Sequence, residues 1–262
     1  MEVAKMIIDS DTHISPQLEW GISITADELL AKMDKVGVDK CVTWIHQPYI
    51  KTKLDESVEY IAEVTKQCPD RIHGFGWYDP RLGLDHALAL AEKSLNEYGL
   101  YGIKLNGSIH KFQIDDKEIA YPVLRKIAEA GKIAAFHCGC DDLANTHPYR
   151  IGKVAKDFPD MRIFMIHMGG EAFQDVSSSA IEIAQLYENI TLIGSQVPKK
   201  SVLSAIRTLG AHRVAFGSDT PFALMGAELA GYKGMMDEAD IPQEDQVMVL
   251  GGTMAKVLGI VK

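Results

Sequence analysis

Short apolar runs rich in β-branched residues alternate along the whole chain with longer stretches in which apolar residues recur every three or four positions. Runs of the first kind predict buried strands, and stretches of the second kind predict amphipathic helices. We expect strands over residues 6–8, 40–45, 72–77, 102–105, 133–136, 162–166, 190–193 and 213–216. We expect helices between them over residues 26–36, 57–67, 84–98, 119–130, 149–158, 180–187 and 200–209.

Several of the expected helices end at a glycine that lies shortly before the next strand, as they do at Gly37 and Gly210. Glycine adopts a left-handed conformation without steric cost and therefore often ends a helix. The strand that follows is short and apolar on both faces, as a parallel sheet requires. The chain thus repeats a strand–helix unit eight times.

The 262 residues divide into eight units of about 33 residues each, which is the unit size of a closed (β/α)8 TIM barrel. A doubly wound open sheet usually has only about five or six strands. No linker rich in proline, glycine or serine divides the sequence. We therefore predict one α/β domain over residues 1–262, a TIM barrel whose residues 223–262 form extra helices after the eighth strand.

Composition and charge exclude several classes of partner. Hydrophobic residues make up 47% of the chain and charged residues 24%, which is typical of a globular protein. The formal charge of −9, without any run of Lys or Arg, argues against nucleic acid and anionic membranes as partners. No signal peptide or membrane span is evident, and the four cysteines are too irregular for a disulfide framework. We expect a cytoplasmic protein that binds a small-molecule substrate.

Side chains that commonly bind metals follow four of the predicted strands. Asp11 and His13 follow the first strand, His137 the fifth, His167 the sixth and Asp219 the eighth. In a parallel barrel these strand ends meet on one face, and a two-residue step along extended chain brings Asp11 and His13 to one side. Each residue alone is as well explained by a helix cap or a hydrogen bond. Together, Asp11, His13, His137 and Asp219 predict a site for one divalent ion, zinc first and manganese or iron as alternatives.

Eight sequence blocks resemble the amidohydrolase superfamily, and within it the amidohydrolase-related family that includes aminocarboxymuconate semialdehyde decarboxylase. The blocks span nearly the whole chain: IIDSDTH (7–13), GIKL (102–105), YPVL (121–124), FHCG (136–139), HPYRI (147–151), FPDMRIFMIHMGG (158–170), AHRVAFGSDTPF (211–222) and GGTMAKVLGI (251–260). The resemblance implies a metal-dependent TIM-barrel enzyme. His13 matches the family directly, whereas Asp11 stands where the family commonly has His, or Glu in some decarboxylases. A carboxylate there still binds a divalent ion but weakens its power to acidify water.

The resemblance also implies roles for individual residues. Asp219 would take a proton from a metal-activated water and deliver it to the leaving group, and His167 would polarise the substrate carbonyl. Candidate substrate contacts lie in the loops and strand ends of the same face: Lys104, Arg81, Trp20, Asn106 and Phe222. Lys104 has an alternative as the ion-pair partner of a nearby carboxylate. Arg81 either holds a substrate carboxylate or pairs with Asp79 or Asp85.

Three functions follow from this site. The first is metal-dependent hydrolysis of a small amide, lactone or ester-like bond by metal-activated water. The alternative is metal-dependent, non-oxidative decarboxylation of an aromatic or unsaturated carboxylic acid, which the carboxylate at position 11 favours. The third is a barrel that binds a ligand without catalysis. Related barrels often form homodimers. The remaining histidines lack ligand spacing and are expected mostly at the surface or in hydrogen bonds: His46, His73, His86, His110, His147 and His212.

Overall fold

The structure, a computed structural model, describes residues 6–16, 22–46, 53–139, 141–170 and 176–260. Its strands are β1 (Ile8–Ile14), β2 (Lys40–Ile45), β3 (Ile72–Gly74), β4 (Gly76–Tyr78), β5 (Gly102–Leu105), β6 (Ile133–His137), β7 (Arg162–Ile166), β8 (Ile190–Ile193) and β9 (Val214–Ala215). Its α-helices are α1 (Ala26–Val36), α2 (Leu54–Gln67), α3 (Leu84–Asn96), α4 (Gly107–His110), α5 (Tyr121–Glu129), α6 (Leu143–Thr146), α7 (Pro148–Asp157), α8 (Ser177–Leu186), α9 (Lys199–Leu209), α10 (Met225–Glu238), α11 (Gln243–Val247) and α12 (Thr253–Leu258).

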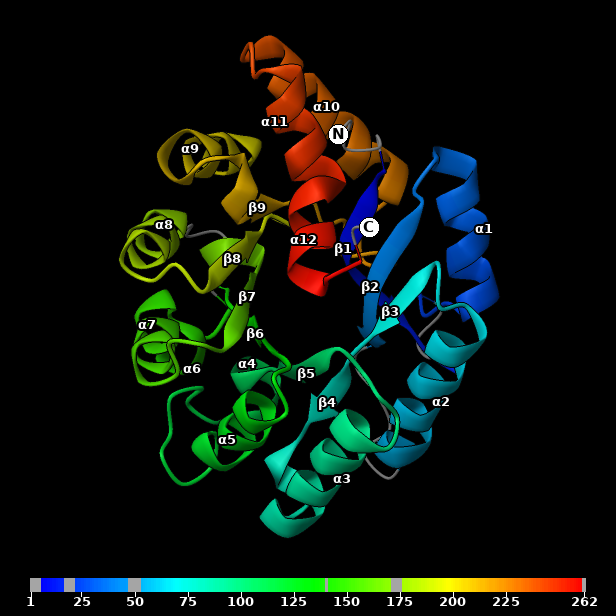
Figure 1. Ribbon diagram of the computed structural model, residues 1–262, viewed down its shortest axis with the longest axis vertical. Helices are drawn as coiled ribbons and strands as arrows, with labels where there is room; N and C mark the ends of the chain where they lie inside the picture. The colour runs from blue at the N-terminus through cyan, green and yellow to red at the C-terminus, as the bar shows by residue number, and fades with distance from the viewer. Residues whose placement is uncertain (1–5, 17–21, 47–52, 140, 171–175, 261–262) are drawn as a thin grey trace.

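All strands pair in parallel, in the orders β1-β2-β3 and β4-β5-β6-β7-β8-β9. The two sheets are continuous, because only Phe75 separates β3 from β4 and its backbone N–H donates to the Thr43 carbonyl at 2.9 Å. At the other edge, the N–H of Ser10 donates to Phe216 and the N–H of His13 to Thr220, at 2.9 and 2.7 Å. The first strand is thereby joined to the last, and the strands form the predicted TIM barrel with helices around the outside (Figure 1).

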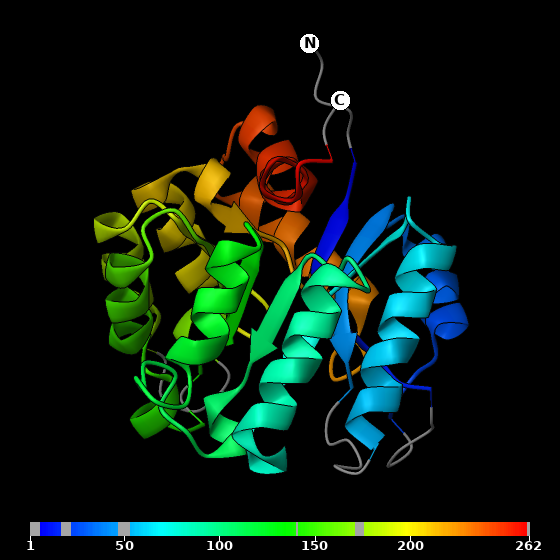
Figure 2. The ribbon, with the colours of Figure 1, turned by 60° about the horizontal axis from the view of Figure 1, so that its bottom comes forward.

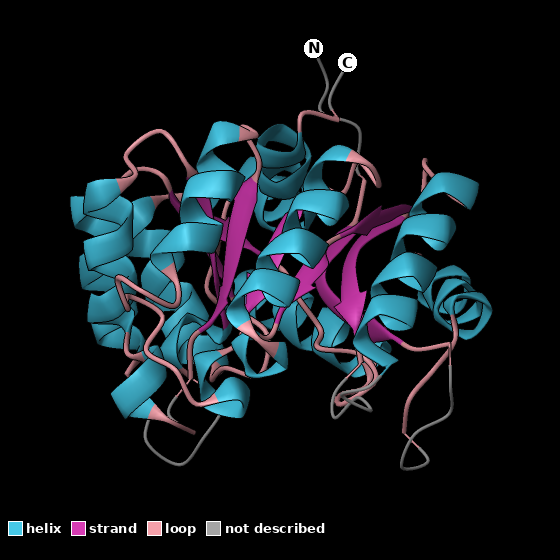
Figure 3. Cartoon of the chain, turned by 90° about the horizontal axis from the view of Figure 1, so that it is seen from below, coloured by secondary structure: helices cyan, strands magenta, loops and turns pink. Residues whose placement is uncertain are grey.

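Buried aromatic rings fill the barrel interior, which is a packed core rather than a pore. The ring of Phe75 lies 5.7 Å from that of Trp44 and 5.8 Å from that of Phe164, centroid to centroid. All three side chains are fully buried, and burying one such apolar side chain stabilises a fold by roughly 1.5–3 kcal/mol. Figure 3 shows the strands enclosed by the helical layer.

Helix α1 shows how local sequence fixes the element boundaries. Thr25 and Glu28 form a capping box, in which each side chain accepts a hydrogen bond from the other residue's backbone N–H. The helix ends at Gly37, whose φ of 77° is the left-handed conformation expected there. Gly210 follows α9 and also has a positive φ, of 85°, although its ψ of 154° differs from that of a left-handed turn. The predicted glycine stops are confirmed at both helices.

Two predicted strands differ from the observed ones. The first was expected over residues 6–8, but β1 extends from Ile8 to Ile14, so Asp11 and His13 lie within the strand rather than after it. The polar residues of β1 resemble a loop in sequence, yet all are buried because the strand pairs with neighbours on both sides. The strand expected over 72–77 is interrupted at Phe75. The short helices α4 and α6, which follow β5 and β6, were not predicted.

The extra C-terminal helices are present as α10, α11 and α12, with a π-helical turn at Met248–Gly252 between the last two. This turn packs directly on the start of β1, because a Cβ atom at Gly251 would overlap the Met6 carbonyl oxygen. Figure 2 shows α12 at the end of the barrel where β1 begins. None of the described helices combines the length and the apolar character needed to cross a membrane.

Candidate metal centre

A cluster of three buried side chains at the carboxyl ends of the strands is capable of holding a metal ion. Asp11 lies on β1, His167 directly follows β7, and Asp219 lies in the segment after β9. One possible ligand atom from each residue lies within 4.8 Å of the others. Two carboxylates and one imidazole form a mixed oxygen and nitrogen set suited to a borderline or hard divalent ion.

The position of Asp11 depends on a bulge in β1. The register with β2 shifts between Asp9 and Thr12, so that β1 contains one residue more than its partner. The Asp11 carboxylate then faces the cluster: its Oδ2 accepts a hydrogen bond from the Ser195 hydroxyl, and its Oδ1 lies 3.9 Å from Lys104 Nζ. Oδ1 has no hydrogen-bond partner in the described part of the chain. A buried carboxylate oxygen without a donor is a good fit to a cation.

His13 borders the cluster with a defined ring orientation. Its Nδ1 lies 2.8 Å from the Ile45 carbonyl, and its Nε2 accepts from the indole N–H of Trp44 at 3.0 Å. These contacts assign the proton to Nδ1 and the lone pair to Nε2. The same Nε2 lies 3.1 Å from Asp219 Oδ1 and 3.6 Å from Asp11 Oδ1. Burial lowers the pKa of His13 to about 4, which keeps the ring neutral, as a metal ligand must be.

Backbone strain is concentrated at the cluster. His167, Met168 and Asp219 have φ values of 64°, 36° and 61°, in the left-handed region that non-glycine residues seldom occupy. Such conformations cost on the order of 1–3 kcal/mol each and persist where the surrounding structure enforces them. For Asp219 one enforcing contact is its own N–H, which donates to the Asp11 carbonyl at 2.8 Å. The same contact places the two carboxylates beside each other.

Electrostatics favour a cation at this position. Burial, followed by the charge of Asp11, raises the pKa of Asp219 well above its usual value. Burial likewise lowers the pKa of His167 well below its usual value. Two carboxylates that destabilise each other's charge in a buried site are both stabilised by a divalent ion. The residues present thus fit the metal that the sequence predicts.

His137 lies beside the cluster, but its described hydrogen bond is directed elsewhere. Its ring is 4.9 Å from that of His167, while its Nε2 lies 3.0 Å from Asp141 Oδ1. Asp141 also accepts from the Ser108 hydroxyl. Burial alone would raise the pKa of Asp141, yet the hydrogen bond and charge of His137 hold it well below its usual range. The compact group thus contains Asp11 and Asp219 of the predicted ligands, with His13 and His137 adjacent to it.

The predicted substrate contacts lie at different distances from the cluster. Lys104 is buried on β5 with its Nζ 3.8 Å from the centroid of a Trp44 ring. Phe222 packs edge-on against His13, with 5.2 Å between ring centroids, and is 41% exposed. Asn106 caps α4, where its Oδ1 accepts from the Ile109 N–H at 3.0 Å. Trp20 lies outside the described residues.

Arg81 has the local partner that the sequence offered as its alternative role. Its Nε and one terminal nitrogen donate to the two carboxylate oxygens of Asp79 at 2.9 and 2.8 Å. Its other terminal nitrogen donates to the Ile109 carbonyl at 3.3 Å. A guanidinium already bonded in this bidentate way has less capacity for a substrate carboxylate.

Two residues with evident roles at the site were not singled out from the sequence. Ser195 donates to Asp11 and lies with its Oγ 3.0 Å from His167 Nδ1. Asp9 accepts from the backbone N–H groups of Asp11 and Ser218, and so links the two segments that supply the carboxylates. Neither residue has a sequence signal beyond its place near a strand end.

Several histidines are also more buried than predicted. The expectation of surface or hydrogen-bonded positions holds for His110, which is buried but accepts from the Trp77 indole N–H at 2.7 Å. It is wrong for His46 and His73, which are each 1% exposed and whose ring nitrogens have no hydrogen-bond partner among the described residues. Of these two, His46 follows β2 at the face that carries the cluster.

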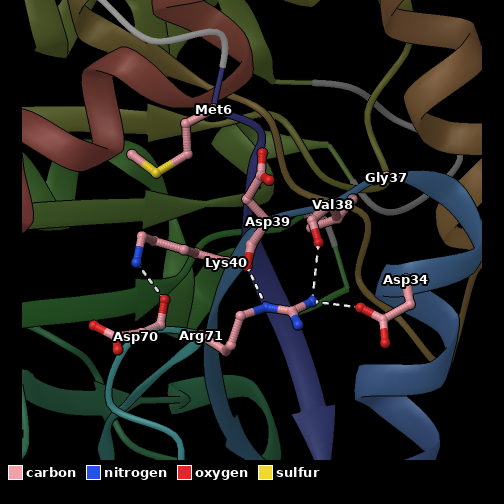
Figure 4. Close-up of a pocket in the computed structure, with 8 residues that line it drawn as sticks. All are labelled: Met6, Asp34, Gly37, Val38, Asp39, Lys40, Asp70 and Arg71. Carbon is pink, nitrogen blue, oxygen red and sulfur yellow. Dashed lines mark hydrogen bonds and ion pairs between the residues drawn. The ribbon is translucent and has the colours of Figure 1, made fainter.

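A cavity of about 630 Å³ lies at the opposite end of the barrel, around the amino ends of β1, β2 and β3 (Figure 4). Its cationic side chains are already bonded: Arg71 donates to Asp34 and to the carbonyls of Val38 and Asp39, and Lys40 donates to the Asp70 carbonyl. The charged groups therefore bond within the protein instead of converging on a ligand. In TIM barrels this end contributes to stability rather than to catalysis.

Comparison with known families agrees with the fold. Residues 50–260 match the family model described as Amidohydrolase, and the chain belongs to this family. The match includes His137, His167 and Asp219, whereas Asp11 and His13 precede it. A search of curated proteins finds no match.

Solved structures with the same fold include several decarboxylases. A 5-carboxyvanillate decarboxylase from Sphingomonas paucimobilis superposes with a TM-score of 0.76 at 17% identity, over 98% of this chain and 100% of the other. A 2,6-dihydroxybenzoate decarboxylase from Rhizobium gives 0.76 at 16% identity, over 97% and 99%. A dihydroxybenzoic acid decarboxylase from Polaromonas sp., with bound manganese and the inhibitor 2-nitroresorcinol, gives 0.74 at 16% identity, over 97% of each chain.

Proposed function

We propose that the protein is a metal-dependent, non-oxidative decarboxylase of an aromatic carboxylic acid, the second of the functions considered from the sequence. The observation that carries this proposal is the buried cluster of Asp11, His167 and Asp219 at the carboxyl end of the barrel. A carboxylate at position 11, where hydrolases of the family commonly have histidine, favours it over hydrolysis. The decarboxylases with the same fold give further support.

Asp11, His167 and Asp219 would hold the ion. His13 would be a fourth donor through its Nε2, whose single lone pair would then exchange its hydrogen bond from Trp44 for the ion. When bound, the ion supplies positive charge that binds the carboxylate of the substrate and stabilises negative charge during the reaction. The donor set is rich in oxygen, and one decarboxylase of the same fold is described with manganese. We therefore place manganese before zinc as the native metal.

The chain's own residues would bind the substrate and handle the proton. Breaking the bond between the ring carbon and the carboxylate leaves its electron pair on the ring carbon and releases carbon dioxide. That carbon must then receive one proton, and Asp219 and His167 are the groups placed to hold it. The buried ammonium of Lys104 adds positive charge on the β5 side of Asp11, and Phe222 offers an apolar face for an aromatic ring.

The experiment compares carbon dioxide release with hydrolysis. The protein is stripped with EDTA, reloaded with Mn²⁺ or Zn²⁺, and assayed with a panel of benzoic acids and with amide and lactone substrates. We expect carbon dioxide release that EDTA abolishes and Mn²⁺ restores. A metal-replete protein that cleaves an amide or lactone but releases no carbon dioxide would instead be a hydrolase.

Hydrolysis of a small amide, lactone or ester-like bond remains the second candidate, since the matched family is described as Amidohydrolase. In that case Asp219 would accept a proton from the attacking water. A non-catalytic barrel is the third, and elemental analysis of protein purified without chelator tests it. Less than about 0.2 metal ions per chain would favour the non-catalytic barrel, because a site with four such ligands normally retains a transition ion.

A further inference from the structure

His46 is a buried imidazole without a hydrogen-bond partner at the catalytic end of the barrel. It directly follows β2, and its backbone N–H donates to the Ile14 carbonyl at 2.8 Å, which fixes the residue in place. Its side chain is almost completely buried, yet neither ring nitrogen has a partner among the described residues. Buried polar groups are nearly always hydrogen-bonded, and one that is not costs free energy. A ligand that hydrogen-bonds to these nitrogens would offset this cost.

The rings around His46 connect it to the metal centre. Its imidazole stacks on Phe222 with a centroid distance of 4.9 Å and an interplanar angle of 14°. It also meets the ring of His13 edge-on at 6.5 Å, and Phe222 contacts the same ring at 5.2 Å. His13 in turn lies 3.1 Å from Asp219. His46 is therefore separated from the cluster by a single ring, next to an aromatic side chain that reaches the surface.

The chemistry of a neutral imidazole narrows what it can bind. Burial without a carboxylate partner disfavours the charged form of the His46 ring, and a neutral imidazole carries one N–H donor and one acceptor. A hydroxyl group both donates and accepts, and it can bond to either tautomer. A carboxylate only accepts and is better matched by a cation, while an ammonium group only donates.

We propose that His46 is a specificity-determining residue that hydrogen-bonds a hydroxyl group on the aromatic ring of the substrate. The inference rests on the proposed function for the aromatic acid, and it adds the residue that distinguishes a hydroxylated acid from an unsubstituted one. Phe222 stacks on the face of the imidazole, so the hydrogen bonds of the two ring nitrogens point along the plane of the stack and not toward Phe222. The ion and Lys104 bind the carboxylate, and His46 binds the hydroxyl.

His73 supplies a matched control. It is as deeply buried as His46, and its nitrogens are also without a hydrogen-bond partner among the described residues. It lies on β3 and contacts Tyr101, which precedes β5, so it belongs to the amino end of the barrel. Replacing His73 thus reproduces the loss of a buried, unpaired imidazole at a distance from the metal centre.

The experiment measures binding rather than turnover. The Mn²⁺-loaded full chain is titrated calorimetrically with benzoate and with 2-, 3- and 4-hydroxybenzoate, for the wild type, His46→Phe, His46→Gln and His73→Phe. We expect the wild type and His73→Phe to bind at least one hydroxybenzoate about tenfold more tightly than benzoate, the effect of one buried hydrogen bond. His46→Phe should lose this preference while still binding benzoate, and His46→Gln, whose amide both donates and accepts, should retain part of it.

The outcomes separate the two proposals. A hydroxybenzoate preference that persists in His46→Phe, or a wild type that binds no hydroxybenzoate more tightly than benzoate, overturns the role of His46. If His46→Phe does not fold, His46→Gln decides. A hydroxybenzoate preference as large as that of the wild type, with unchanged affinity for benzoate, counts against the role of His46, and a reduced preference supports it. A preference that depends on His46, together with no carbon dioxide release from any benzoic acid of the panel described above, refutes the proposed decarboxylation and leaves the binding role intact.

Discussion

The carboxyl group of Asp9 makes the stability of the protein depend on pH in a way that one substitution isolates. Burial raises the pKa of Asp9 from 3.8 to about 7, against the effect of the hydrogen bonds from Ser218 and Asp11. Its Oδ2 has no hydrogen-bond partner in the part of the chain that the structure describes. The folded protein therefore binds this proton more tightly than the unfolded chain does.

Because the pKa of Asp9 is higher in the folded protein than in the unfolded chain, the free energy of unfolding decreases as the pH rises. Well below pH 3.8 the group is protonated in both states, and the folded state has its full relative stability. As the pH rises from 4 to 7 the unfolded chain loses its proton first, so the free energy of unfolding falls. Each pH unit in this window corresponds to about 1.4 kcal/mol. Between pH 5 and pH 7 the wild type should lose about 2–3 kcal/mol that Asp9→Asn does not lose.

The assay is urea denaturation of the metal-free protein, followed by circular dichroism at pH 5, 6, 7 and 8 in the presence of EDTA. Asparagine retains an oxygen that accepts from the two backbone N–H groups and cannot ionise, so it removes only the titration. Asp160→Asn, at an exposed position, controls for the loss of an aspartate elsewhere. Unfolding free energies of wild type and Asp9→Asn that stay parallel within about 0.5 kcal/mol from pH 5 to pH 8 would refute the reasoning.

Four further substitutions test other parts of the structure. Asp219→Asn should keep the fold by circular dichroism and lower turnover at least about 100-fold, because a proton carrier is lost; an active, metal-replete variant contradicts its role. Ser195→Ala removes the donor to Asp11 and should weaken Mn²⁺ binding about tenfold in calorimetric titration, whereas unchanged affinity would show that the hydroxyl is dispensable. Tyr232→Phe removes a buried hydrogen bond to a backbone carbonyl and should lower the free energy of unfolding by about 1 kcal/mol; a loss near zero would mean that water replaces it. Arg81→Ala should change KM for an anionic substrate less than about twofold, because the guanidinium is already paired; a tenfold rise in KM with unchanged kcat would instead assign it to substrate binding.

The barrel could be predicted from the sequence because the same strand and helix pattern recurs in every unit. Each unit carries a short apolar strand and an amphipathic helix, and the glycine stops at Gly37 and Gly210 appear where expected. The prediction was wrong at β1, since a strand of buried polar residues lacks the apolar pattern that reveals the others. Its pairing is set by β2 and by residues 216–220, and sequence periodicity contains no information about such distant partners.

The residue types of the candidate site could be predicted from the sequence, but its geometry could not. Asp11, His167 and Asp219 were singled out because each stands beside a strand and one face of a barrel collects them, although His167 was expected to act on the substrate, and His13 and His137 to be ligands. The left-handed conformations of His167 and Asp219, and the hydroxyl of Ser195, follow from tertiary contacts between segments far apart in the chain. His46 escaped notice because a lone histidine after a strand carries no motif, and only burial without a partner distinguishes it.

Two candidate metal ligands lie on opposite sides of the seam at which the barrel closes. Asp11 belongs to the first strand and Asp219 to the segment after the last, and backbone bonds join these two regions directly. During synthesis Asp11 can contact Asp219 only after most of the chain has been made. A cation that binds only the closed barrel stabilises the closure, so the free energy of unfolding should increase with the concentration of free metal.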